Sequence, residues 1–286
     1  MPSLRFASLL IVCLGGFFVG GSTTHAQFSG TGGPPRPFGG GVVGSYSTGD
    51  GLGVSQWSAN LRGGLPIKLP TDFLLLSPSY SETKFDLDGP ERLPSKLFRV
   101  SLAVMWLHRV GEENSWLFGI TPSLTGDRET LGETVRLFAM GMYNWQVVPD
   151  KLRMSLGVAY TGRADVPALP LAGLVWTPTE EWFVSLMMPK PKIARRVWGD
   201  STASVWMYLG TELGGGTWDI DDGLGNREAF SYREFPLVLG IEQNTENFGR
   251  WFAEIGAGLG RRAEFENADR MVGFGESLFM QGGWNY

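Results

Sequence analysis

The sequence has one cysteine and two histidines among its 286 residues, and this scarcity excludes several kinds of site. Cys13 and His25 both lie in residues 1–26, which we expect to be removed as a signal peptide, so His108 is the one histidine of the mature chain. A thiol nucleophile, a disulfide and a cysteine-based zinc site are therefore excluded. Any Ser–His–acid site would depend on His108 alone. We expect no catalytic residue, metal or cofactor.

Charged residues are also scarce, and the basic ones do not outnumber the acidic ones. The 24 Lys and Arg residues stand against 29 Asp and Glu, which gives a net charge of −5 and argues against a nucleic-acid partner. Only 6 of the 24 basic residues are Lys, whereas Gly is abundant at 41 and there are 11 Trp and 18 Phe. This composition favours sheets and tight turns over helices.

Long apolar runs are absent as well. Residues 9–21 form an apolar stretch of 13 residues behind Arg5, which is too short for a transmembrane helix and is typical of a secretory signal. Small residues at Thr24 and Ala26 predict cleavage between Ala26 and Gln27. Residues 27–52 are rich in Gly and Pro, and we expect a flexible leader there, with room for a short strand at 42–47. No apolar run of 18 residues follows.

What the rest of the chain does have is alternation with a period of two. Large apolar residues alternate with small, polar or charged ones in the segments 98–106, 116–124, 152–160 and 251–259. Successive strand residues face opposite sides of a sheet, so each segment has an apolar face and a polar face. The segments typically run for 10–14 residues, which suits a tilted membrane strand better than the shorter strands of a soluble sandwich.

The connections between these segments alternate in length. Short ones occur at 66–72, 110–114, 148–150, 177–180, 199–200 and 243–249, and generally longer or more polar ones at 86–96, 126–133, 162–166, 189–192, 214–229 and 262–269. Outer-membrane barrels have short periplasmic turns and longer outer loops. We therefore predict one domain over 53–286, an all-β, antiparallel up-and-down transmembrane barrel of the bacterial outer membrane. Its even strand number is 14, or 12 if 181–198 is one bent strand.

The aromatic residues support a membrane location. Seven tryptophans lie near the short turns and predict a periplasmic girdle contacting outer-membrane lipid: Trp106, Trp116, Trp145, Trp176, Trp182, Trp198 and Trp251. The alternative is that they fill a core. The final residues are typical of the signal that barrel-assembly machinery, the expected partner, recognises: Leu278, Met280, Trp284 and Tyr286. Gly282 departs from that pattern.

Two segments resemble a family of uncharacterised bacterial outer-membrane β-barrels (domain of unknown function 6268). The first comprises Leu-Pro-Leu-Ala-Gly-Leu-Val-Trp-Thr-Pro at 169–178, Glu-Trp at 181–182 and Met-Pro-Lys-Pro-Lys-Ile at 188–193. The second is Gly-Leu-Gly-Arg-Arg-Ala-Glu-Phe at 258–265. Trp176 and Val197-Trp198 stand where that family would have Tyr-like residues. The resemblance covers about 53–286 and implies a fold and a membrane, but no substrate.

The candidate functional residues are charges on the polar face. Alternate positions of a strand face the same side, and this parity places seven charged residues toward the lumen: Arg99, Arg136, Arg153, Glu212, Glu242, Glu254 and Arg262. Charged rings set the ion preference of a pore, whereas charges that pair across a filled barrel only hold it shut, and the sequence favours neither. His108 shares the parity of Trp106 and fits an interfacial side chain better than a base. Asp219, Asp221 and Asp222 fall in the longest expected loop, and because they lack the EF-hand spacing for Ca²⁺ we expect a solvated acidic loop there.

The leading interpretation is thus a non-enzymatic outer-membrane protein, a candidate small pore for polar solutes. The alternatives are a barrel enzyme acting on lipid or peptide, and a secreted soluble β-sandwich.

Overall fold

The computed structural model describes residues 38–69, 71–88, 93–163, 166–200, 202–221, 226–246 and 248–286. The expected signal peptide, its cleavage site and residues 27–37 lie outside this part of the chain. The strands are β1 (Phe38–Gly49), β2 (Leu52–Lys68), β3 (Asp72–Leu87), β4 (Lys96–Val110), β5 (Asn114–Gly126), β6 (Val135–Val148), β7 (Leu152–Tyr160), β8 (Ala168–Trp176), β9 (Trp182–Ser185), β10 (Lys192–Gly199), β11 (Ala203–Thr211), β12 (Gly214–Asp221), β13 (Arg227–Thr245), β14 (Gly249–Phe265), β15 (Arg270–Gly273) and β16 (Ser277–Asn285). Among the described residues there is no helix that could cross a membrane.

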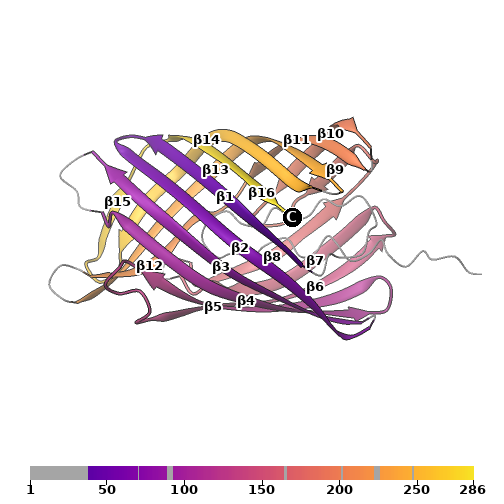
Figure 1. The fold of residues 1–286 in the computed structure, drawn as a ribbon, viewed down its shortest axis with the longest axis horizontal. Helices are drawn as coiled ribbons and strands as arrows, with labels where there is room; N and C mark the ends of the chain where they lie inside the picture. Colours follow the sequence, from indigo (N-terminus) through magenta and orange to yellow (C-terminus); the bar gives the residue numbers. More distant parts are fainter. Residues whose placement is uncertain are drawn as a thin grey trace, which may run out of the picture.

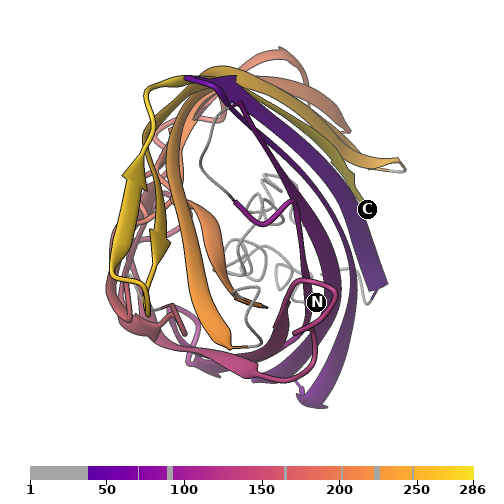
Figure 2. The ribbon, with the colours of Figure 1, turned by 90° about the vertical axis from the view of Figure 1, so that its left-hand side faces the viewer.

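Fourteen of these strands form one closed wall. Neighbours in the chain pair antiparallel from β1 to β11, and the ring continues through β13, β14 and β16. It closes because β16 pairs with β14 on one edge and with β1 on the other. Figure 1 shows the tilted strands from the side, and Figure 2 looks along the oval barrel. The predicted all-β, antiparallel, up-and-down barrel with an even strand number is confirmed, and the two packed sheets of a sandwich are excluded.

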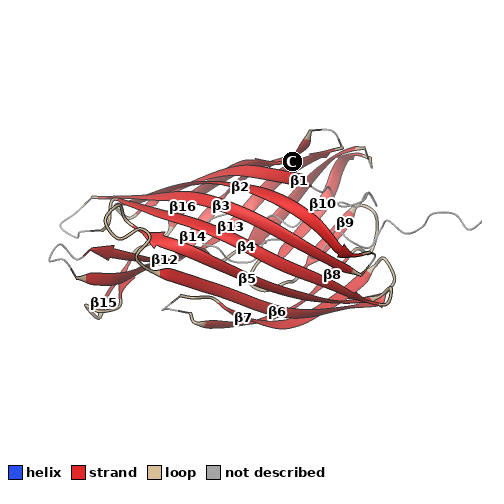
Figure 3. Cartoon of the chain, turned by 60° about the horizontal axis from the view of Figure 1, so that its bottom comes forward, coloured by secondary structure: helices blue, strands red, loops and turns tan. Residues whose placement is uncertain are grey.

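The segment 181–198 forms two strands. β9 and β10 pair with each other, with Lys192 opposite Ser185, so the strand number is 14 rather than 12. The connections divide the barrel into two ends. The short-turn end carries the turns that precede β3, β5, β7, β9, β11 and β14, and the loop end carries the others, on the left in Figures 1 and 3.

The expected leader boundary at residue 52 is wrong. Residues 38–49 form β1, a full wall strand that pairs with both β2 and β16. Its glycines serve close packing and not flexibility, because a Cβ on Gly41 would collide with the side chain of Asn285. The barrel therefore begins at Phe38, and the short strand expected at 42–47 is the middle of a longer one.

The two faces of the wall follow the predicted parity. On β5, Phe118 and Ile120 are exposed on the outside, whereas Leu117 and Thr121 are buried inside. The same division holds on β7, where Leu156 and Val158 are exposed. The alternation read from the sequence therefore assigned the outer and inner faces of these strands correctly.

The longest predicted loop, 214–229, is instead largely strand. β12 pairs along its whole length with the first half of β13, from Gly214 opposite Glu234 to Asp221 opposite Arg227. Most of β12 is buried on both faces, so it lacks the apolar–polar alternation that marks the wall strands. This strand, which we call the crossing strand, positions the candidate site.

Candidate functional site

The crossing strand spans the inside of the barrel at the loop end. One edge pairs with β13, and the other meets β5, where Asp219 lies opposite Gly126. In the ring of 14 strands, six strands separate β5 from β13 in either direction: β6 to β11 on one side, and β4 to β1, β16 and β14 on the other. The crossing strand therefore connects opposite walls.

A tight turn after β5 holds the far edge of the crossing strand. Oδ1 of Asp127 accepts hydrogen bonds from the backbone N–H groups of Glu129 and Thr130, both at 2.9 Å. Oδ2 accepts from the backbone N–H of Asp221 at 3.2 Å, and the Thr130 hydroxyl donates to the Asp219 carbonyl at 2.6 Å. Partial burial alone would raise the pKa of Asp127, but these hydrogen bonds outweigh it and leave the pKa below its ordinary value. The anchor is therefore ionised at neutral pH.

Three arginines bind the crossing hairpin, which consists of β12 and the part of β13 that pairs with it. Arg136 on β6 makes the shortest contact, 2.6 Å from Nη2 to Oδ1 of Asp219, and its Nη1 donates to the Gly162 carbonyl at 3.2 Å. Arg99 on β4 donates to the carbonyl of Thr217 at 3.4 Å and lies over the ring of Trp218 at 5.1 Å.

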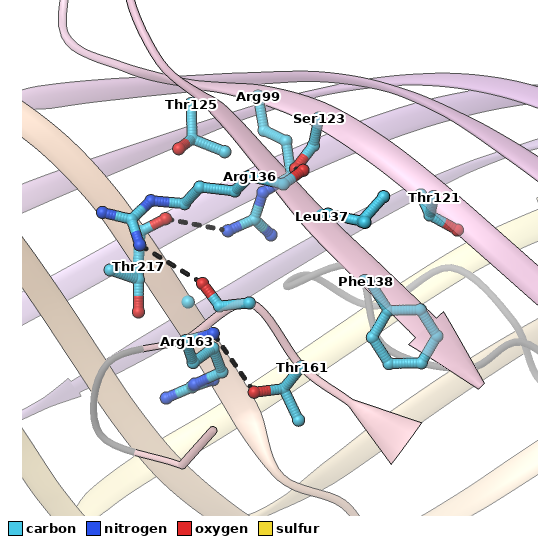
Figure 4. A pocket seen from close by; sticks show the side chains of 12 residues that line it. Arg99, Thr121, Ser123, Thr125, Arg136, Leu137, Phe138, Thr161, Arg163 and Thr217 are labelled. Atoms are coloured by element: carbon cyan, nitrogen blue, oxygen red, sulfur yellow. Dashed lines mark hydrogen bonds between the residues drawn. The ribbon is translucent and has the colours of Figure 1, made fainter. Parts of the chain in front are cut away.

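The third arginine, Arg163, follows β7. It donates from Nη2 to the carbonyl of Tyr232 on β13 at 3.3 Å. Figure 4 shows the side chains of Arg99 and Arg136 extending toward Thr217, with Arg163 on the same side of the crossing strand. The arginines thus act on the backbone and on one carboxylate of the hairpin.

The crossing strand has a cavity on each side. The first lies against β4 to β7, has a volume of about 30 Å³, and is lined by the three arginines and by hydroxyl groups that include Thr121, Ser123 and Thr125. The second is of similar volume and lies toward β1 to β3 and β16, with Gln56, Thr83 and Gln281 among its lining residues. Both are polar and narrow, with room for a water or another small group.

Beyond these cavities, the loop end is filled by aromatic side chains. Phe85 of β3 makes edge contacts with Phe230 and Tyr232 of β13, at ring-centroid distances of 5.4 and 5.2 Å. Trp218 and Phe265 join the same buried cluster. Aromatic rings packed in this way exclude water and make a rigid core. The loop end therefore has no wide opening through this cluster.

A second polar network lies on the inner face of β10 to β14. Lys192 contacts Glu242 at 2.7 Å and lies 3.5 Å from the centre of the Tyr208 ring. The Tyr208 hydroxyl donates to Glu254 at 2.6 Å. Glu242 has no solvent exposure, and a buried carboxylate is stable only when it is paired in this manner.

The other predicted lumen charges have mixed outcomes. Arg99, Arg136, Glu242 and Glu254 face inward, and Glu212 forms an ion pair with Lys190 at 2.5 Å. Arg153 is half-buried near the short-turn end of β7. The structure thus places Arg136, Glu212 and Glu242 against opposite charges, with partners that parity did not predict.

The prediction for Arg262 is wrong, and its neighbour Arg261 is the buried arginine. Between Arg233 and Phe235 of β13 the register with β14 shifts by one residue, and Gly260 has a φ of 59°. A bulge inserts one extra residue and moves every following side chain to the other face. Arg262 is therefore exposed, and Arg261 points inward with no side-chain exposure.

Arg261 connects the first hairpin of the barrel to the last strands. It donates to the carbonyls of Gly49 and Leu52 at 2.7 and 2.8 Å, and to the Tyr232 hydroxyl at 3.2 Å. Glu234 lies 3.7 Å from its Nε. This side chain therefore stabilises barrel closure near the loop end.

We expect Arg261→Met to lower the free energy of unfolding by about 3–5 kcal/mol, because it leaves Glu234 and two carbonyls without their buried cation. Arg262→Met, at the exposed neighbour, is the matched control and should change it by less than about 0.5 kcal/mol. Urea unfolding of the purified barrel in detergent measures both. Equal losses for the two variants would contradict the bulge assignment.

On the outside, the seven predicted girdle tryptophans lie toward the short-turn end. Six are exposed and Trp145 is half-buried. Rings contact one another across β4, β5 and β6: Trp106 stacks on Phe118 at 5.8 Å, and Trp116 lies 4.7 Å from Tyr143 in a tilted arrangement. Rim groups accept from two of the indole N–H groups: Asp72 from Trp106 at 3.1 Å and Gln243 from Trp251 at 2.8 Å. The expectation that tryptophan fills a core fails for these seven residues.

His108 belongs to this outer rim. Its Nδ1 lies 2.9 Å from Oδ1 of Asp72, and its ring is 5.5 Å from that of Trp106. The solvated acidic loop expected at Asp219, Asp221 and Asp222 is wrong for Asp219, which is buried against Arg136, and Asp222 lies outside the described residues. Within the described residues, no group of three His, Cys, Asp or Glu side chains could hold a metal ion.

Comparison with known proteins adds little to this geometry. No protein-family model matches the chain, and no curated protein is detectably similar to it. A solved structure from work on the mechanism of in-meso crystallization of membrane proteins aligns with 87% of this chain and 83% of its own. The sequence identity is 11% and the TM-score is 0.29, a likeness that carries no argument about function.

Proposed function

We propose that this chain is a non-enzymatic β-barrel of a bacterial outer membrane, with a narrow passage for small polar solutes that the crossing strand restricts. The observation that carries the proposal is the outer face of the wall. Large apolar side chains are exposed at outward positions on many of the strands, among them Leu61 on β2, Leu102 on β4, Leu156 on β7, Leu239 on β13 and Ile255 on β14. Soluble monomers rarely expose apolar patches beyond a few hundred Å².

The tryptophan girdle supports a membrane whose apolar layer ends near the short-turn end of the barrel. Exposed tryptophans gather toward the short-turn end, and Trp106, Trp251 and Trp284 donate hydrogen bonds from their N–H groups at the rim, Trp284 to the Phe248 carbonyl at 2.8 Å. This is the environment that tryptophan prefers at a membrane–water interface. We therefore assign the short-turn end to the periplasm and the loop end to the outside. Export by the signal peptide and insertion by barrel-assembly machinery belong to the same proposal.

The inside supports a restricted passage rather than an open pore. The crossing strand and the aromatic cluster occupy the loop end, and the two cavities beside the crossing strand are narrow and lined by hydroxyl, amide and charged groups. Such a lining suits small hydrophilic solutes. A barrel enzyme has less support, because His108 contacts Asp72 and Trp106 on the outer rim, away from the polar lumen.

We also propose that the chain belongs with the outer-membrane family that it resembles. The resembling segments lie in β8, in the connection that precedes β10, and in the bulged end of β14. These are structural positions of the wall. The structure of a member of that family would test the proposal, since it should have 14 strands and a bulge at the same place.

Membrane location is tested by arginine substitutions at two depths on the outer face. Ile255 lies along the middle of β14 and is 54% exposed, whereas Val135 begins β6 at the loop end and is 63% exposed. We expect Ile255→Arg to cost about 2–4 kcal/mol of folding free energy in lipid and Val135→Arg about 0–1 kcal/mol. In a soluble barrel both side chains would meet water and both costs would be small.

The measurement is folding into lipid vesicles, followed by heat-modifiable gel mobility, together with fractionation of cells that express each variant. Inner glycines are unsuitable controls, because a Cβ on Gly256 would collide with the Leu237 carbonyl. Small and equal effects at Ile255 and Val135, or recovery of the wild-type chain without detergent, would refute the membrane assignment.

A further inference from the structure

We infer that the cavity between the crossing strand and β4 to β7 is a binding site for a small oxyanion, with phosphate as the reference ligand. Its lining brings the guanidinium groups of Arg99, Arg136 and Arg163 together with hydroxyl groups from the wall (Figure 4). Within the described residues, no acidic side chain is among those that line it. Guanidinium groups match the geometry of phosphate and carboxylate oxygens, and hydroxyl groups supply further donors.

The positive side chains are held away from bulk water. Arg99 is 6% exposed and Arg163 is 8% exposed, and the charges of Arg163 and Arg136 act on Arg99. Bringing like charges together in a buried site is costly. An anion bound among them would reduce that repulsion.

Two donor atoms of the site have no partner. The hydroxyl of Thr125 is buried, with the residue 1% exposed, and neither it nor Nε of Arg136 has a hydrogen-bond partner. Buried donors of this kind are rare in folded proteins, and an unfilled ligand position is a recognised reason for them. Since Thr125 lines the cavity and Arg136 already uses both of its Nη atoms, the spare donors indicate a ligand.

The size of the cavity limits the ligand. A volume of about 30 Å³ accepts a single small group, and it excludes a sugar or a peptide.

The test is direct binding to the full mature chain, folded and purified in detergent. Titration calorimetry and the unfolding temperature are followed with sodium phosphate, with sodium sulfate and sodium chloride as comparisons at equal ionic strength. We expect saturable binding of phosphate and of sulfate, since both are tetrahedral oxyanions, and no saturable effect of chloride. The measurement does not depend on passage of solutes, so its failure is distinguishable from failure of the proposed pore.

Three variants locate the site. Arg136→Gln should weaken phosphate binding about tenfold or more, because it removes charged donors. Thr125→Val, which keeps the side-chain shape and holds no other group, should weaken it about fivefold. Arg262→Gln changes net charge equally on the exposed face and should leave it unchanged.

Heat-modifiable mobility checks that each variant is folded. If Arg136→Gln does not fold, the phosphate affinity of Thr125→Val decides whether the site is assigned correctly. Absence of saturable phosphate binding, or equal binding by Thr125→Val and the wild type, would overturn the assignment.

Discussion

Removal of the crossing strand should turn a poorly conducting barrel into an open pore. Replacement of residues 213–235 by an Asn-Gly turn joins β11 to β13 next to the existing pair Thr211 and Leu237. Asn-Gly suits a two-residue hairpin turn. All 14 strands of the wall remain, while the crossing strand, Trp218 and the β13 part of the aromatic cluster are lost.

The expected change is large because two obstructions disappear together. Conductance in planar bilayers should rise from near the background to discrete, readily measured steps, and vesicles carrying the variant should swell in small sugars that the wild type excludes. A Gly-Ser insertion between Glu112 and Glu113, in a turn at the opposite end, is the control and should leave both measurements unchanged. A folded, heat-modifiable variant that still fails to conduct would show that the lumen is closed elsewhere.

The fold was largely predictable because the signal for a wall strand is local. A strand with lipid on one side and polar groups on the other must alternate, and this alternation assigned faces correctly on β4, β5, β7 and most of β14. Two predictions were wrong because they depend on features that do not alter the alternation of residue types. Residues 38–49 looked flexible because glycine is usually read that way, although here glycine permits close approach of β16. Arg262 was misplaced because a one-residue bulge reversed the phase after Gly260.

The candidate site was only half predictable, for a different reason. Arg99 and Arg136 were found by parity, since they lie on wall strands. Arg163 lies after β7, outside any strand, so parity gives it no face. The crossing strand reaches β5 through contacts between residues almost a hundred positions apart, such as Thr130 and Asp219. Nothing in the local pattern of 214–221 reports such a contact, and burial of both faces removed the alternation that would have marked a strand.

Deletion of Trp284, Asn285 and Tyr286 should abolish insertion into the outer membrane. The last residues close the ring at the short-turn end: Trp284 lies opposite Val42 of β1 and Trp251 of β14, and the backbone of Tyr286 exchanges hydrogen bonds with Gly40 at 2.8 and 3.1 Å. A barrel in lipid has no free edge only when this seam is paired. The deletion removes the short-turn end of the seam and the aromatic part of the predicted assembly signal together.

In the proposed topology, export and signal cleavage depend on residues 1–26, so we expect the truncated chain still to reach the periplasm at its mature size and to be degraded there. Fractionation, heat-modifiable mobility and a pulse-chase measurement separate export from insertion. Trp284→Phe with Tyr286→Phe is the matched control. It keeps aromatic rings at both positions and the whole backbone seam, and should insert at close to normal yield. Because a soluble barrel would tolerate the loss of three surface residues, normal yield of the truncated chain in the membrane would contradict both the assembly signal and the role of this seam.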